Sequence, residues 1–233
     1  LSSGIGTGTS SGAVIMKTVN SGTKGVSGKL SFTSGTTSSG SSGSIELYSG
    51  DATNGEGGDI LLSIGKSKTD FGGDIRLLGG DSEPYTGGAI SFGSGEGTKT
   101  SSGAIVMSTV NSGTNGVSGM LSFTSGTTSS GSSGSFTVGT GTATNGKGGD
   151  MILSIGSGTT YTGGDIIVTG GQSTYVSGGT GGSISISTGY GRSTSSGALI
   201  VSTYNSGTKG ISGKLSFTSG TTSDGASGSI EIY

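Results

Sequence analysis

Residues 26–45 read VSGKLSFTSGTTSSGSSGSI, and the chain repeats this stretch twice in nearly the same order. VSGMLSFTSGTTSSGSSGSF occupies residues 117–136, and ISGKLSFTSGTTSDGASGSI occupies residues 211–230. A flexible linker needs abundant glycine, serine and threonine, but it does not need them in a fixed order. The retained order therefore indicates a regular structure rather than a linker.

The overall composition excludes several classes of protein. The 233 residues include 55 glycines, and only 27% of them are hydrophobic. Because cysteine and histidine are absent, the sequence predicts no disulfide, no thiolate or imidazole metal ligand and no His-containing catalytic triad. A formal net charge of −2 argues against a nucleic-acid partner, which would require excess lysine and arginine. No apolar run approaches the about 20 residues of a membrane span.

A repeat of about 15 residues becomes visible when each repeat is started at the glycine that precedes a hydrophobic alternation. Positions 3 and 5 are apolar in every one of these repeats. Because alternate residues of a strand point to the same face, each repeat predicts a short strand with two inward-facing apolar side chains. The repeats begin at Gly12, Gly28, Gly43, Gly58, Gly73, Gly88, Gly103, Gly119, Gly134, Gly149, Gly164, Gly182, Gly197, Gly213 and Gly228.

This period predicts an all-β fold, a β-solenoid of the β-helix or β-roll kind with one repeat per coil. Like positions of successive coils are expected to stack, with their backbones paired about 4.8 Å apart. The glycine usually found at position 8, as at Gly35 and Gly50, is expected to make a turn that needs positive φ.

A longer period of six repeats lies on top of the shorter one. Residues 11–65 match residues 102–156 at a shift of 91, with 41 of 55 positions identical, and the next shift is 94. We therefore expect residues 1–233 to form a single continuous solenoid, built from blocks at 11–101, 102–195 and an incomplete 196–233. Because neither end carries a capping repeat, the chain is expected to be part of a longer array.

Each block opens with a repeat of 16 residues, and the repeat from Gly164 has 18. An asparagine marks each of the 16-residue repeats, at Asn20, Asn111 and Asn205. Asparagine tolerates left-handed backbone angles, so it is expected to accommodate the extra residue.

Four aspartates are the strongest candidates for a metal site. Asp59 and Asp74 share position 2 of adjacent repeats, as do Asp150 and Asp165. Stacked carboxylates could bind calcium, which prefers oxygen ligands. Calcium β-rolls, however, repeat continuously every nine residues, so solvated, outward-facing aspartates are the favoured interpretation. No catalytic, cofactor-binding or metal-binding residue is assigned.

Other chemistries are weighed against ordinary structural roles. A pair of carboxylates can serve a glycosidase, but the acids lie at outward positions without a large insertion to form a cleft, so no enzymatic activity is expected. No Gly-Lys-Ser/Thr phosphate loop opens a helix. Threonine arrays at Thr127–Thr128, Thr142–Thr144 and Thr159–Thr160 raise the possibility of ice binding, but they do not continue unbroken, and threonine is a common strand residue.

The segments SGTTSSGSSGSI, TNGKGGD and TGGSISISTG resemble Ser/Gly/Thr-rich repeats of large secreted surface and matrix proteins of diatoms and related stramenopile algae. The resemblance spans nearly the whole chain and brings no catalytic residues with it. It implies an extracellular or cell-surface location and a role in a matrix, an adhesive or a surface fibre.

The sequence thus predicts a structural protein that forms a stiff filament, stalk or adhesive fibre through stacked β-coils. Its expected partners are further copies of itself, joined end to end or laterally, and no cofactor is expected. The alternative is a solenoid that displays a binding surface for ice, mineral or polysaccharide.

Overall fold

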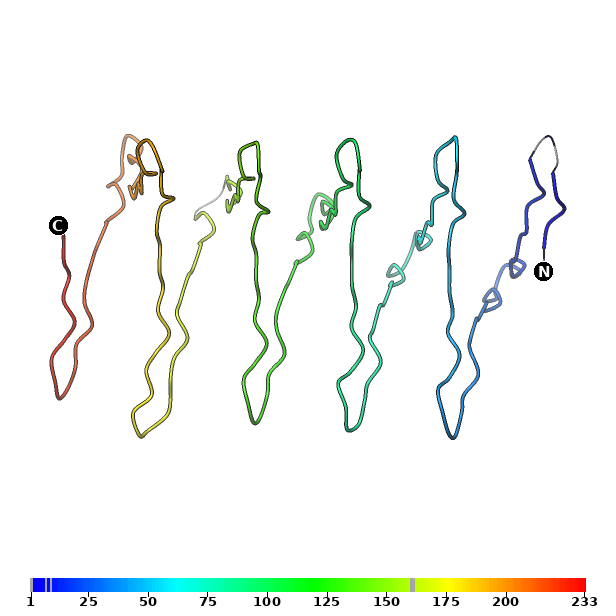
Figure 1. Ribbon diagram of the computed structural model, residues 1–233, viewed down its shortest axis with the longest axis horizontal. Coiled ribbons are helices and arrows are strands. Elements are labelled where there is room, and N and C mark those ends of the chain that lie inside the picture. Colours follow the sequence, from blue (N-terminus) through cyan, green and yellow to red (C-terminus); the bar gives the residue numbers. More distant parts are fainter. Residues whose placement is uncertain (1, 7, 9, 160–161) are drawn as a thin grey trace. The chain divides into compact units, whose positions relative to one another are not determined.

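The computed structural model describes residues 2–6, 8, 10–159 and 162–233. Within these ranges the chain forms neither helix nor β-strand. It runs instead as extended segments that are joined by loops and fold back on one another (Figure 1). The chain divides into two units, Leu1–Leu121 and Ser122–Tyr233.

The loops of both units recur with the period of the sequence. In the 15-residue repeats whose loops are fully described, the bend falls at positions 11–13, as at residues 38–40 and 53–55 of the first unit and at residues 129–131 and 144–146 of the second. In the three 16-residue repeats a turn takes its place at residues 23–24, 114–115 and 208–209. We call positions 1–8 of a repeat its extended segment and the remaining residues its loop.

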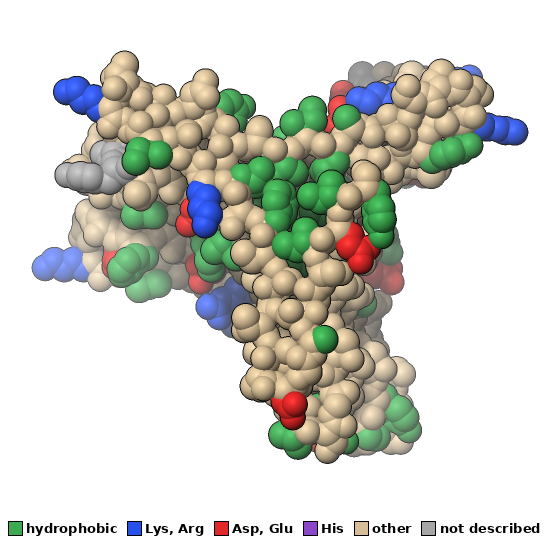
Figure 2. All heavy atoms as spheres, turned by 90° about the vertical axis from the view of Figure 1, so that its left-hand side faces the viewer, with side chains coloured by type: hydrophobic (Ala, Val, Ile, Leu, Met, Phe, Trp, Pro, Cys, Tyr) green, Lys and Arg blue, Asp and Glu red, His purple; other side chains and the backbone are tan. Residues whose placement is uncertain are grey.

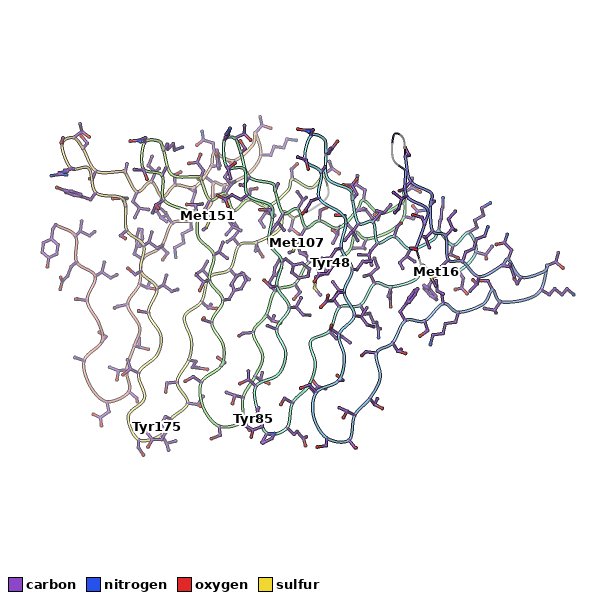
Figure 3. All side chains as sticks on the ribbon, turned by 45° about the vertical axis from the view of Figure 1, so that its right-hand side comes forward. Met16, Tyr48, Tyr85, Met107, Met151 and Tyr175 are labelled. Carbon is purple, nitrogen blue, oxygen red and sulfur yellow. The ribbon has the colours of Figure 1, made fainter. Side chains whose placement is uncertain are left out.

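Figure 3 places individual side chains on this frame. Tyr85 and Tyr175 lie at the ends of loops, whereas Met16, Met107 and Met151 lie on extended segments. The two tyrosines follow polar and glycine-rich stretches, while the three methionines occupy positions 3 or 5 of their repeats. The sequence position within a repeat therefore decides whether a residue lies on a segment or in a loop.

Successive extended segments face each other in antiparallel fashion, with position 7 of one repeat opposite the glycine that begins the next. In the first unit, a Cβ atom built on Gly58 would lie 3.5 Å from the Cβ atom of Ser49. In the second unit, a Cβ atom on Gly134 would lie 3.5 Å from that of Ser125. A larger residue at position 1 would therefore meet the preceding segment.

The same register places position 5 of one repeat opposite position 3 of the next. Phe123 and Phe136 occupy these two positions. Their rings stack with centroids 6.2 Å apart and an interplanar angle of 22°. The contact therefore joins unlike positions that are brought together when the chain folds back.

Single backbone hydrogen bonds close several loops between position 8 and the next position 1. The amide of Gly88 donates to the carbonyl of Gly80 at 2.8 Å, and the amide of Gly197 donates to the carbonyl of Gly189 at 3.1 Å. An antiparallel ladder requires such bonds at regular intervals along both strands. One bond per loop brings the segments together without making them a sheet.

The predicted β-solenoid is therefore wrong. That fold requires like positions of successive repeats to stack through continuous backbone ladders, but the described residues contain no strand. The apolar alternation is compatible with both stacked coils and folded-back segments. It determines which side chains share a face, but it does not determine which segment lies opposite that face. Folding back places position 5 against position 3 and leaves the rest of the backbone unpaired by neighbouring segments.

The expected burial of the apolar side chains at positions 3 and 5 is also wrong. No side chain in the described part of the chain is buried, and Figure 2 shows apolar groups at the surface. The alternation itself is retained in weaker form: Ile60 at position 3 is 48% exposed, whereas Leu61 at position 4 is 87% exposed. One facing segment covers one side of each apolar side chain and leaves the other open.

The predicted positive φ at position 8 is corrected as well. The glycines with positive φ include Gly40, Gly131 and Gly225, with φ values of 102°, 113° and 133°. All three occupy position 13 of the same repeat in successive blocks, at the end of the bend. The reversal of the chain thus takes place five residues beyond the glycine expected to make it.

Candidate functional site

The four aspartates weighed as a calcium site are exposed. Asp74 pairs with Arg76 at 3.6 Å, and Asp150 pairs with Lys147 at 2.7 Å. In the described ranges, no three acidic side chains come close enough together to hold a metal ion. The coil stacking that would bring Asp59 over Asp74 is not formed.

One of the threonines weighed as an ice-binding array, Thr128, makes hydrogen bonds within its own loop. Thr128 donates through Oγ1 to the carbonyl of Ser130 at 3.1 Å, and its Oγ1 accepts from the Ser130 amide at 3.3 Å. Thr37 makes the same two bonds with Ser39, at 2.9 and 3.2 Å. These bonds stabilise the bend that ends at the positive-φ glycine. Thr160 lies outside the described residues.

The turn of the 16-residue repeats has the same geometry in all three blocks. Ser21 Oγ donates to the carbonyl of Gly25 at 2.8 Å. The equivalent bonds are Ser112 to Gly116 at 2.9 Å and Ser206 to Gly210 at 2.8 Å. In each case the amide of the second glycine also bonds back to the glycine that follows the serine. The conserved hydrogen bonds give each block one loop of defined shape.

That loop presents a branched apolar side chain to solvent. The residue directly after the turn is Val26, Val117 or Ile211 in the three blocks, and these side chains are 96%, 96% and 98% exposed. A fully exposed apolar side chain is ordinary when it occurs singly. Its recurrence after the same turn makes these three side chains a candidate contact site.

The apolar pairs of the extended segments form the larger candidate surface. We define an apolar pair as position 5 of one repeat and position 3 of the next, of which Phe123 and Phe136 are an example. Although these two rings stack, they remain 55% and 65% exposed. Each pair is thus partly assembled and keeps an open side, which can accept a further apolar surface.

The last residues of the chain hold the clearest electrostatic interaction. The Tyr233 hydroxyl donates to Glu231 Oε2 at 2.6 Å, and Ser229 Oγ donates to Glu231 Oε1 at 3.1 Å. The hydrogen bonds from Tyr233 and Ser229 lower the pKa of Glu231. The bond to the Glu231 carboxylate raises the pKa of Tyr233. In the first block, Ser44 Oγ similarly donates to Glu46 at 3.2 Å.

Position 7 has a role that the sequence analysis missed. Its residue lies opposite the glycine that begins the next repeat, and the approach is closest at Ile64 and Ile155, where a Cβ atom on Gly73 or Gly164 would lie 2.8 Å from the isoleucine Cγ2. The sequence signal for this role was that position 7 holds only serine, threonine, isoleucine or glycine. The residues at position 7 of the repeats from Gly12 to Gly119 are Thr18, Ser34, Ser49, Ile64, Gly79, Ser94, Thr109 and Ser125.

The described residues enclose no pocket, and within them no helix has the length and hydropathy needed to cross a membrane. No family model, curated protein or solved structure matches the chain.

Proposed function

We propose that the chain is a structural repeat protein of the cell exterior that forms a filament, stalk or adhesive fibre. The observation that carries this proposal is the return of one loop geometry in three blocks, with the same serine-to-glycine hydrogen bonds. A chain built in this way offers the same groups at regular intervals. Regular spacing is the property a fibre needs, because each contact can then be repeated along its length.

The extended segments supply the mechanical element. Loops such as the one between Gly80 and Gly88 are closed by a single backbone hydrogen bond, which contributes about 0.5–1.5 kcal/mol net. Tension would open such loops one after another and lengthen the chain before it loads the covalent backbone. The resulting fibre is extensible rather than stiff, because stacked coils do not carry its load.

The exposed apolar side chains after the turns supply the adhesive element. Val26, Val117 and Ile211 are almost fully exposed. Each one contributes little by itself, but several contacts on one chain act together through a high effective concentration. Repetition thus converts weak contacts into durable attachment.

A second candidate is a surface-binding protein whose ligand is polysaccharide. Tyr85 and Tyr175 lie at loop ends (Figure 3) and are 83% and 71% exposed. Flat aromatic rings with one polar edge suit a surface that is partly apolar and partly hydrated. Ice and mineral surfaces are the remaining ligands of this class.

Electron microscopy of the native assembly tests the principal proposal. We expect continuous fibres in which a feature returns once per six-repeat block. Discrete, monodisperse particles would contradict the fibre.

Co-sedimentation with insoluble polysaccharide tests the second candidate. Replacing both Tyr85 and Tyr175 with alanine should abolish binding if the tyrosines hold the sugar, whereas a Tyr48→Ala variant, altered in an extended segment, should bind as the unaltered chain does. Binding that survives the double substitution would contradict this role of the loop ends.

A further inference from the structure

The extended segments leave far more surface open than a folded chain of this mass. The accessible surface is 23397 Å². A folded monomer of 22.1 kDa exposes about 9,000 Å², and its fully unfolded chain exposes about 32,000 Å². The difference from the folded monomer is about 14,000 Å², whereas a standard stable interface buries only about 1,600 Å² in total. The chain thus has enough open surface for several such interfaces.

The open surface includes one face of every apolar pair. Positions 3 and 5 face a neighbouring segment on one side only, as the half-exposed rings of Phe123 and Phe136 illustrate. The strict alternation in all the repeats keeps charged residues out of these positions. A partner that fits must therefore carry an apolar row with the same spacing.

The segments also leave backbone groups open beside these side chains. The described residues form no strand ladder, so the amides and carbonyls of an extended segment are free to pair with another extended chain. Unpaired extended backbone is a template for strand pairing. With 10% charged residues and a net charge of −2, little repulsion opposes the approach of an identical chain.

A second copy of this chain meets both requirements, and the unequal repeat lengths favour one register. A shift of one block still sets 16-residue repeats opposite one another, but it places the 18-residue repeat from Gly164 opposite the 15-residue repeat from Gly73. The extra residues of the longer repeats face one another when two copies run parallel with identical residues opposed. This arrangement also places each apolar pair beside the same pair of the other copy.

We propose that the extended segments of two or more copies of this chain pair in parallel and in register, so that the apolar pairs become buried between chains. This pairing rests on the proposed fibre function and specifies the contact that builds the fibre. It differs from coil stacking because the paired backbones belong to separate molecules.

The absence of cysteine allows a direct test with one spin label per chain. Ser122 lies between the two apolar residues of its segment, so a label on Ser122→Cys should come close to its counterpart in the next copy. We expect dipolar broadening of the electron paramagnetic resonance spectrum, and we expect it to disappear when labelled chain is diluted with excess unlabelled chain. Fibres whose label shows no broadening would overturn the pairing but leave the fibre function intact. A chain that stays single at every concentration would overturn both.

Two neighbouring isoleucines provide a matched pair of variants. Ile166 occupies position 3 and is 51% exposed, whereas Ile167 occupies position 4 and is 78% exposed. Ile166→Ser should weaken association by about tenfold or more, because it removes an apolar side chain from the contact. Ile167→Ser should change association by about twofold or less, as surface substitutions do. Equal effects of the two substitutions would overturn the assignment of positions 3 and 5 to the contact.

Discussion

At the scale of single residues, the space opposite explains the glycine that begins two of the repeats, Gly73 and Gly164. A Cβ atom on Gly73 would lie 2.8 Å from Ile64 Cγ2, and one on Gly164 would lie 2.8 Å from Ile155 Cγ2. These distances are too short for van der Waals contact between carbon atoms. At these two positions glycine is therefore favoured because the segments approach closely, and not because the backbone needs an unusual φ.

Adjacent glycines allow this explanation to be tested. Gly73→Ala should force the facing segments apart at a cost of about 1–3 kcal/mol, as overpacking does. Gly72→Ala should have little effect, because a Cβ atom there meets nothing within 4 Å. The measurement is the nuclear Overhauser effect between the Ile64 methyl group and the α proton of residue 73. Its persistence in Gly73→Ala at full intensity would contradict the close approach.

The hydrogen bond between Tyr233 and Glu231 predicts a local pH dependence. The lowered pKa of Glu231 and the raised pKa of Tyr233 mean that the bond is formed when the carboxylate is ionised and the phenol protonated. It is lost as pH falls through the lowered pKa of Glu231 and as pH rises through the raised pKa of Tyr233. In Glu231→Gln, the pKa of Tyr233 should fall toward its ordinary value in a carbon-detected magnetic resonance titration. An unchanged Tyr233 titration would show that the carboxylate does not raise this pKa.

At the scale of the repeat, the loop and its flanking segments form the basic structural element. The loop of the 16-residue repeats is the best-defined example, because serine Oγ holds the same glycine carbonyl in three blocks. Local side-chain hydrogen bonds of this kind stabilise turns without help from a core. The shape of each loop is therefore encoded within its own few residues.

Removing one of these serines should affect one turn only. In Ser112→Ala, the Gly116 amide should exchange with solvent about two- to fivefold faster, because a net hydrogen-bond contribution of about 0.5–1 kcal/mol is lost. The equivalent amides of Gly25 and Gly210 in the same molecule serve as controls and should not change. Faster exchange at all three glycines, or at none, would contradict local encoding of the turn.

The sequence predicted the period of this element but not its pairing. Positions 1 to 5 of each repeat were expected to form a strand, but the described residues contain none. The turns at residues 23–24, 114–115 and 208–209 return once per six-repeat block, although the sequence analysis did not locate them. The apolar alternation is the same whether segments stack with like positions aligned, as in a solenoid, or face the preceding segment in antiparallel fashion. The restricted choice of residues at position 7 was the signal for the antiparallel arrangement, because only a folded-back chain places position 7 opposite position 1 of the next repeat. Ser125 opposite Gly134 is an example.

The sequence analysis assigned no site residue and favoured ordinary structural roles for the aspartates and threonines. In the structure Asp150 pairs with Lys147, and Thr128 stabilises a bend. The open faces of the apolar pairs were expected to be buried, so their availability for contact could not be predicted. The exposure of a side chain depends on the segment that lies opposite it, and the apolar alternation does not specify that segment.

At the scale of the whole chain, the central question is how a chain that buries so little apolar surface can keep an ordered structure. Ordering the backbone costs about 1–2 kcal/mol per residue, and glycine, at 55 of 233 residues, loses the most freedom. A single copy buries none of its described side chains to offset this cost. Association with further copies would bury the apolar pairs and supply the missing free energy.

The most direct test of ordering by association is sedimentation velocity combined with far-ultraviolet circular dichroism over a wide range of chain concentration. We expect large species to grow as the chain concentration rises and the spectrum to gain extended-strand character in parallel. A single species with the mass of one chain and an unchanged spectrum at every concentration would contradict it.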